Sequence, residues 1–89
     1  MLRSEIIFTG RVQGVGFRYT ACRVAERFDV SGWVRNEPDG SVRCVVEGEA
    51  GEIERFLASL RDAMADHIED MKSTPAAATG EFAGFTIRR

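Results

Sequence analysis

The spacing of apolar residues alternates along this chain between the period of a strand and the period of a helix. Residues 5–9 are β-branched and aromatic and end at Gly10, which predicts a strand. From Phe17 to Phe28, apolar residues recur every three or four positions, which predicts an amphipathic helix of about three turns. The same spacing returns in a second predicted helix, at Ile53, Phe56, Leu57, Leu60 and Met64.

The pattern of a β-hairpin lies between the two predicted helices. Residues 30–37 and 41–48 predict two strands, and Pro38-Asp39-Gly40 predicts the turn that joins them. Proline presets its own φ, and Gly40 can adopt a positive φ, so this tripeptide suits a tight reversal of the chain.

The segment after the second helix is less regular. Residues 67–74 alternate too weakly to give more than a poor strand signal, residues 75–80 are small and predict a loop, and residues 82–88 predict a closing strand. Two helices with one apolar face each must cover one side of an antiparallel sheet. We therefore expect an α+β fold, a ferredoxin-like split βαβ sandwich whose sheet is antiparallel or mixed and has an extra C-terminal strand. A length of 89 residues suits a single domain, residues 1–89.

Charge is divided unevenly between the two halves of the chain. Residues 1–43 carry seven arginines against five acidic residues, a net charge of +2, whereas residues 44–89 carry five basic and nine acidic residues, a net charge of −4. The excess is too small for a nucleic-acid surface, although the first half is mildly attractive to a small anion. No apolar run approaches the roughly 20 residues of a membrane span, and the N-terminus lacks the apolar core of a signal peptide. The cytoplasm is therefore the default expectation.

Residues that commonly bind metals are few. His67 stands alone, and Cys22 and Cys44 lie far apart in the sequence, so we expect no metal site. Two cysteines do not make a disulfide framework, and we expect both thiols to be reduced and partly buried.

The stretch from Gly10 to Arg18 reads Gly-Arg-Val-Gln-Gly-Val-Gly-Phe-Arg and joins the first predicted strand to the first predicted helix. Its glycines let the backbone curl with the N–H groups facing inward, and at a helix N-terminus such a curl binds anions. Arg18 lies in the first helical turn, where its guanidinium can bind two oxygens of one phosphate. The alternative is a plain strand-to-helix turn, but that needs fewer glycines and no adjacent arginine. The stretch is neither a Walker loop nor a dinucleotide-binding fingerprint.

Asn36 is the second candidate for a functional residue. It ends a predicted strand, and its carboxamide can both donate to and accept from a water molecule. Spacing alone leaves open the alternative of an ordinary turn-initiating asparagine. We interpret Phe8 and Trp33 as packing residues and His67 as a surface or interface residue. Among the other arginines, Arg11 is best placed to add positive charge to the site.

Two motifs together resemble the acylphosphatase family. The first is the stretch of residues 10–18, and the second is Gly32-Trp33-Val34-Arg35-Asn36, which is followed by Pro38-Asp39-Gly40. Both motifs have the order and spacing of the family. The resemblance continues through the second helix and resumes at Gly84-Phe85-Thr86-Ile87-Arg88, but residues 65–79 follow no family pattern.

The resemblance implies hydrolysis of a small-molecule acyl phosphate to a carboxylate and inorganic phosphate, without metal. We expect a cytoplasmic monomer with no cofactor and with no membrane or nucleic-acid partner. Arg18 would bind the phosphoryl group, and Asn36 would hold the attacking water for in-line displacement at phosphorus. These residue types suit the reaction, because phosphoryl transfer depends mainly on positioning and charge stabilisation. The phosphate would also be bound by the backbone N–H groups of the loop, at Gln13, Gly14, Val15, Gly16 and Phe17.

Three other functions remain open on the sequence. The motifs also resemble the N-terminal domain of hydrogenase-maturation carbamoyltransferases, but those are far longer chains, so a free-standing domain favours the simple enzyme. A phosphate-binding regulatory module would keep the loop and Arg18 without turnover. An RNA-binding sheet of this topology would need aromatic residues on its central strands, and residues 41–46 contain none.

Overall fold

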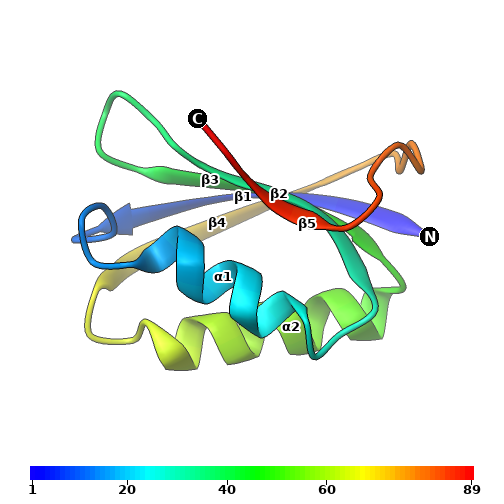
Figure 1. Ribbon diagram of the computed structural model, residues 1–89, viewed down its shortest axis with the longest axis horizontal. Helices are drawn as coiled ribbons and strands as arrows, with labels where there is room; N and C mark the ends of the chain where they lie inside the picture. Colours follow the sequence, from blue (N-terminus) through cyan, green and yellow to red (C-terminus); the bar gives the residue numbers. More distant parts are fainter.

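The computed structural model describes all of residues 1–89 and places both helices on one face of a five-stranded sheet (Figure 1). The strands lie side by side in the order β4-β1-β3-β2-β5; neighbouring strands are antiparallel except β5, which runs parallel to β2. The ferredoxin-like α+β prediction is confirmed, with a mixed sheet. Neither helix is long and apolar enough to cross a membrane. The elements are β1 (Leu2–Gly10), α1 (Phe17–Ala25), β2 (Val30–Asn36), β3 (Val42–Gly48), α2 (Ala50–Ala63), β4 (Ile68–Ala76) and β5 (Phe85–Arg88).

The hydrophobic core lies between the sheet and the two helices. Ile6 and Phe8 of β1 are fully buried, as are Phe56 and Leu60 of α2. The ring of Phe17, at the start of α1, packs on the ring of Phe8 with centroids 4.9 Å apart. Burying a large apolar side chain contributes roughly 1.5–3 kcal/mol. This contact therefore anchors the beginning of α1 to the middle of the sheet.

Strand β4 is longer than the sequence predicts. It runs to Ala76 and includes Pro75, which the sequence analysis assigned to a loop. Pro75 is the register partner of Ser4 in β1, and β4 is an edge strand with no neighbour on its other side. A proline is tolerated there because the missing N–H is not needed for a second ladder.

Other helix and strand ends differ from the predicted ones, because backbone hydrogen bonding sets these ends and the pattern of apolar side chains does not. β1 begins at Leu2, earlier than predicted, since β3 and β4 pair with it on both sides. α1 ends at Ala25, and the N–H of Phe28 then donates to the carbonyl of Ala25 at 3.1 Å, which is a tighter turn than an α-helix makes. β5 begins only at Phe85, so Phe82 lies outside it.

One buried carboxylate holds the irregular segment between β4 and β5. Glu47 of β3 is 1% exposed and accepts hydrogen bonds from the backbone N–H groups of Thr79 and Gly80, each at 2.9 Å. It also accepts a hydrogen bond from Arg3 Nε at 2.7 Å. Arg3 belongs to β1, so this carboxylate connects two strands of the sheet to the segment of residues 77–84.

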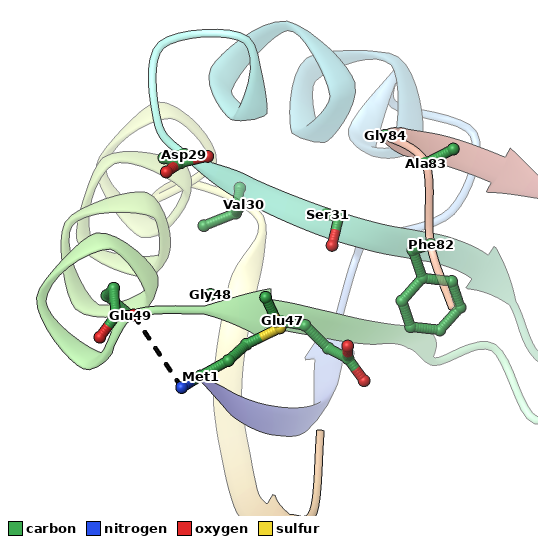
Figure 2. Close-up of a pocket in the computed structure, with 10 residues that line it drawn as sticks. All are labelled: Met1, Asp29, Val30, Ser31, Glu47, Gly48, Glu49, Phe82, Ala83 and Gly84. Atoms are coloured by element: carbon green, nitrogen blue, oxygen red, sulfur yellow. Dashed lines mark ion pairs between the residues drawn. The ribbon is translucent and has the colours of Figure 1, made fainter. Parts of the chain in front are cut away.

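The largest cavity of the protein, about 440 Å³, lies beside this carboxylate (Figure 2). Met1, Glu49 and Phe82 lie around it, and the Met1 ammonium is 3.9 Å from a carboxylate oxygen of Glu49. None of the residues predicted to bind phosphate lines this cavity. Because Glu47 is already saturated by its own partners, we do not regard the cavity as a catalytic site.

The pairing of Glu47 predicts how stability depends on acidity. Burial alone would raise the pKa of this carboxyl, but the hydrogen bonds from Thr79, Gly80 and Arg3 outweigh it and lower the pKa from 4.5 to about 2. A depressed pKa means that the stabilisation is present above the unfolded value and is lost as pH falls. The free energy of unfolding should therefore decrease as pH falls from about 4.5 to about 2.

Denaturant unfolding at a series of pH values would test this dependence. Glu47→Gln should give a less stable protein whose stability falls less steeply over the same pH range. Glu54→Gln is the matched control, since Glu54 is an exposed carboxylate of α2. An equally steep fall in the Glu47→Gln protein would show that Glu47 does not set the acid limit.

Candidate active site

The ends of β1 and β2 meet at one end of the sheet because both strands pair with β3. Phe8 of β1 and Asn36 of β2 are register partners of the same residue, Val42. Register partners direct their side chains to the same face of a sheet, and Phe8 faces the helices, so Asn36 lies on the helix side too. The loop that follows β1 therefore comes close to Asn36.

The glycine loop is anchored at both ends by buried side chains. Val12 is 1% exposed and Phe17 is 2% exposed. Between them, Gly14 and Gly16 have φ angles of +76° and +77°, in the left-handed region that favours glycine. A Cβ at either glycine would meet no protein atom within 4 Å. Backbone conformation, rather than crowding inside the protein, is therefore what requires glycine here.

The loop presents a run of free backbone donors. The N–H of Arg11 donates to the carbonyl of His67 at 2.9 Å, and the next backbone N–H to donate is that of Thr20, to the carbonyl of Gly16 at 3.0 Å. From Val12 to Tyr19, no backbone N–H has an acceptor within the protein. Such a run ending at a helix N-terminus favours the binding of an anion.

A cavity of about 180 Å³ lies between this loop and the end of β2. Arg18 lines it and is the one charged residue there; the first turn of α1 contains no acidic residue, and no carboxylate pairs with Arg18. The guanidinium is therefore free to bind a negatively charged ligand. The residues around the cavity are Val12, Gly14, Gly16, Phe17, Arg18, Tyr19, Asn36 and Ile87.

Gln13 was expected to contribute its backbone N–H to the site, but its side chain makes a separate contact outside the cavity. It leaves the cavity and donates to the carbonyl oxygens of Glu37 and Ser41, at 2.7 Å and 2.9 Å. These two residues flank the hairpin turn that follows Asn36. Gln13 thus ties the glycine loop to the strand end that carries Asn36. From the sequence, only the backbone N–H of Gln13 was expected to contribute to the site, and no sequence signal indicated this side-chain contact.

The hairpin turn bears on the alternative interpretation of Asn36. A side-chain oxygen of Asp39 accepts hydrogen bonds from the backbone N–H and the hydroxyl of Ser41, at 2.9 Å and 2.6 Å. These bonds lower the pKa of the Asp39 carboxyl. Asp39, rather than Asn36, therefore closes the turn with its side chain. Asn36 makes no such turn contact, and its side chain lines the cavity.

Several other candidates lie away from the cavity. Arg11 does not line it, so the expected addition of positive charge from Arg11 finds no support. Phe8 is fully buried in the core, as predicted. Trp33 is 8% exposed, with the Arg35 and Arg88 guanidinium carbons 4.9 Å and 4.7 Å from its ring centre. This ring is enclosed by its own neighbours and is not free to stack on a base.

The two cysteines also lie outside the cavity. Both are free thiols, and burial raises the pKa of each, most strongly for the fully buried Cys44. A raised pKa keeps a thiol protonated and unreactive. No group of three or more His, Cys, Asp or Glu side chains is arranged to hold a metal ion.

Three residues that line the cavity were not among the predicted site residues. Val12 and Tyr19 belong to the loop and the helix start, and Ile87 comes from β5. The alternation of Phe85 and Ile87 indicated a strand with an apolar face. No sequence signal indicated that β5 would pair with β2 and bring Ile87, the register partner of Val34, beside Asn36.

Comparison with known proteins extends these observations. A family model of acylphosphatases matches residues 4–87. A protein named acylphosphatase from Nocardioides sp. is 53% identical over 58 residues, which cover 65% of this chain and 59% of that relative. Another from Methylococcus capsulatus is 39% identical over 90 residues, which cover 100% of this chain and 98% of that relative.

The solved structures agree with the sequence matches. The crystal structure of acylphosphatase from Bacillus subtilis superimposes with a TM-score of 0.88 at 31% identity, and the match covers 100% of both chains. HypF from T. kodakarensis matches with a TM-score of 0.85 at 28% identity, but this chain covers only 12% of it. With nearly its whole length matched by the family model, this chain belongs to the acylphosphatase family.

Proposed function

We propose that Arg18, the glycine loop and Asn36 carry out the hydrolysis of acyl phosphates that characterises this family. The observation that carries the proposal is the meeting of three features at one cavity. These are the free backbone donors from Val12 to Tyr19, the unpaired guanidinium of Arg18, and the carboxamide of Asn36. The backbone donors and Arg18 belong to the glycine loop and the first turn of α1, whereas Asn36 belongs to β2, and both β1 and β2 pair with β3.

The phosphoryl group binds between the loop and Arg18. The backbone N–H groups of residues 13–17 donate to its oxygens, and the guanidinium of Arg18 donates to two of them in a fork. These donors are preorganised, because Val12 and Phe17 are buried at the two ends of the loop. Preorganised donors stabilise the charge that develops in the transition state without reorganising during the reaction.

Asn36 positions the water molecule that attacks the phosphorus. The water oxygen forms a bond to phosphorus while the bond from phosphorus to the acyl oxygen breaks, and the bonding electron pair leaves with the carboxylate. A phosphoryl oxygen accepts the proton that the water loses, so the products are a carboxylate and inorganic phosphate. A carboxylate is a good leaving group, so the reaction needs no strong protein base. Positioning and charge stabilisation supply the catalysis.

We propose a cytoplasmic, monomeric enzyme that binds no nucleic acid and needs no metal. Two free thiols support a reducing compartment. The small number of exposed large apolar side chains supports a monomer. The enclosed ring of Trp33 and the net charge of −2 speak against a nucleic-acid surface.

Arg18→Lys tests the role of the guanidinium. Lysine keeps the charge but loses the planar fork, so activity on an acyl phosphate should fall by roughly tenfold to a thousandfold. Steady-state kinetics would measure the loss. Arg61→Lys, at an exposed arginine of α2, is the matched control and should keep the parental rate. Near-parental hydrolysis by Arg18→Lys would remove Arg18 from the site.

Asn36 separates an enzyme from a module that only binds phosphate. If Asn36 positions water, it contributes to the transition state and hardly to the binding of inorganic phosphate. Asn36→Ala should therefore bind inorganic phosphate about as well as the parent, yet show a kcat and kcat/KM at least roughly a hundredfold lower. Asn36→Asp should also be impaired, because it places a negative charge beside the phosphate and removes a donor.

Calorimetric titration with phosphate, thermal melts and kinetics on these two variants would test the role of Asn36. A structural asparagine would give the opposite pattern, namely a lower melting temperature with intact turnover.

Metal independence is tested by chelation. Activity should survive prolonged treatment with EDTA, because the proposed charge stabilisation comes from Arg18 and backbone donors. Inorganic phosphate should inhibit competitively, since it occupies the same donors as the substrate. Loss of activity in EDTA that one added divalent ion restores would overturn the metal-free mechanism.

A further inference from the structure

Exposed apolar side chains are concentrated beside the cavity. Five large apolar residues of this protein are exposed, and three of them belong to this end of the molecule: Val15 at the tip of the loop, Tyr19 and Ile87. The other two, Met1 and Leu2, lie at the opposite end of β1. Tyr19 and Ile87 both line the cavity, and they are 62% and 41% exposed.

The cavity is thus chemically divided. Its polar donors come from the glycine loop, Arg18 and Asn36, whereas Tyr19 and Ile87 contribute an aromatic ring and a branched aliphatic side chain. Arg18 is the only charged residue that lines it. When the polar donors bind the phosphoryl group, the apolar side chains remain available to contact the rest of the substrate. No acidic residue lines the cavity, and Arg23, which contacts Tyr19, is not among the lining residues.

The side chain of Tyr19 is held in place by a neighbour on the same helix. Its hydroxyl oxygen accepts a hydrogen bond from a guanidinium nitrogen of Arg23 at 2.9 Å, and the Arg23 guanidinium carbon lies 5.7 Å from the ring centre. These contacts favour one orientation of a ring that is 62% exposed. A ring with a preferred orientation loses less conformational entropy when a ligand packs against it.

We infer that Tyr19 and Ile87 form the acyl-binding wall of the site and select aromatic or branched aliphatic acyl phosphates over short ones. This inference rests on the proposed function, since it assigns the acyl half of the substrate whose phosphoryl half binds the loop. The acyl group packs against the ring of Tyr19 and the side chain of Ile87. Its C–O bond stays intact while the bond from that oxygen to phosphorus breaks. An apolar wall gains affinity with each buried methylene or ring face of the acyl group.

Benzoyl phosphate and acetyl phosphate are suitable probes, because they share the reacting bond and differ in the acyl group. The parent should have a higher kcat/KM for benzoyl phosphate than for acetyl phosphate. Tyr19→Ser and Ile87→Ser should each lower the ratio of the two kcat/KM values by about fivefold or more. The inhibition constant of inorganic phosphate should stay at the parental value, since phosphate does not reach the wall.

Two control variants sharpen the test. Tyr19→Phe keeps the ring and loses the hydroxyl, so it should keep most of the preference. Leu2→Ser removes an exposed apolar side chain at the far end of β1 and should leave both kcat/KM values unchanged. Because Tyr19 and Ile87 are exposed, their serine variants should stay folded, which thermal melts would check.

The outcomes separate the two proposals. If the parent hydrolyses neither acyl phosphate, the proposed function fails. If it hydrolyses both and the serine variants keep the parental ratio, the acyl-binding wall is overturned while the proposed function stands. A fall in both kcat/KM values by the same factor, together with weaker inhibition by phosphate, would mean that the variants distort the loop. That result would also overturn the wall.

Discussion

The antiparallel pairing of β1 and β2 with the central strand β3 is the constraint on which the site depends. Val42 pairs with Asn36, the last residue of β2, and with Phe8, two residues before the end of β1, so the loop after β1 and the end of β2 reach the same end of the sheet. Phe17 then locks the start of α1 onto Phe8 in the core. A shift of β2 by one residue against β3 would turn Asn36 to the opposite face of the sheet, because side chains alternate with a period of two.

Local electrostatics at the site differ from the net charge of the protein. The chain carries a net charge of −2, yet the cavity is lined by one unpaired guanidinium and by backbone donors without acceptors. Elsewhere, Arg3, Arg35, Arg43 and Arg55 form ion pairs with carboxylates. Attraction of an anion to this end therefore comes from a short-range arrangement of dipoles and one charge, rather than from the field of the whole molecule.

Sequence alone predicted those parts of the protein that local chemistry determines. Gly14 and Gly16 indicated a curled backbone that other residues resist, and both adopt a positive φ. Arg18 and Asn36 were predicted from motif order, and they line one cavity. The two helices followed from apolar periodicity. The ends of elements were less predictable, because Pro75 joins β4 only where a sheet edge makes its missing donor harmless.

Contacts between distant segments were not predictable from the chain. The side chain of Gln13 donates to two carbonyl groups, one on each side of the hairpin turn, and predicting this contact requires knowing how the turn packs against the loop. Ile87 reaches the cavity only because β5 adds to the edge of β2 in parallel. Glu47 is a charged residue in a strand, and its burial depends on a segment more than thirty residues later that folds over it.

The parallel addition of β5 to β2 also decides how this protein can be joined to others. β5 runs toward the end of the sheet that carries the cavity of Arg18 and Asn36, and Ile87 is already level with Val34, whereas Leu2 pairs with Gly48 at the other end of the sheet. A fusion partner or surface linker attached before Met1 would leave from the end remote from the cavity. The same attachment after Arg89 would start beside the cavity mouth and crowd it. Immobilisation through the N-terminus therefore suits a surface-bound form of this enzyme that must remain open to substrate.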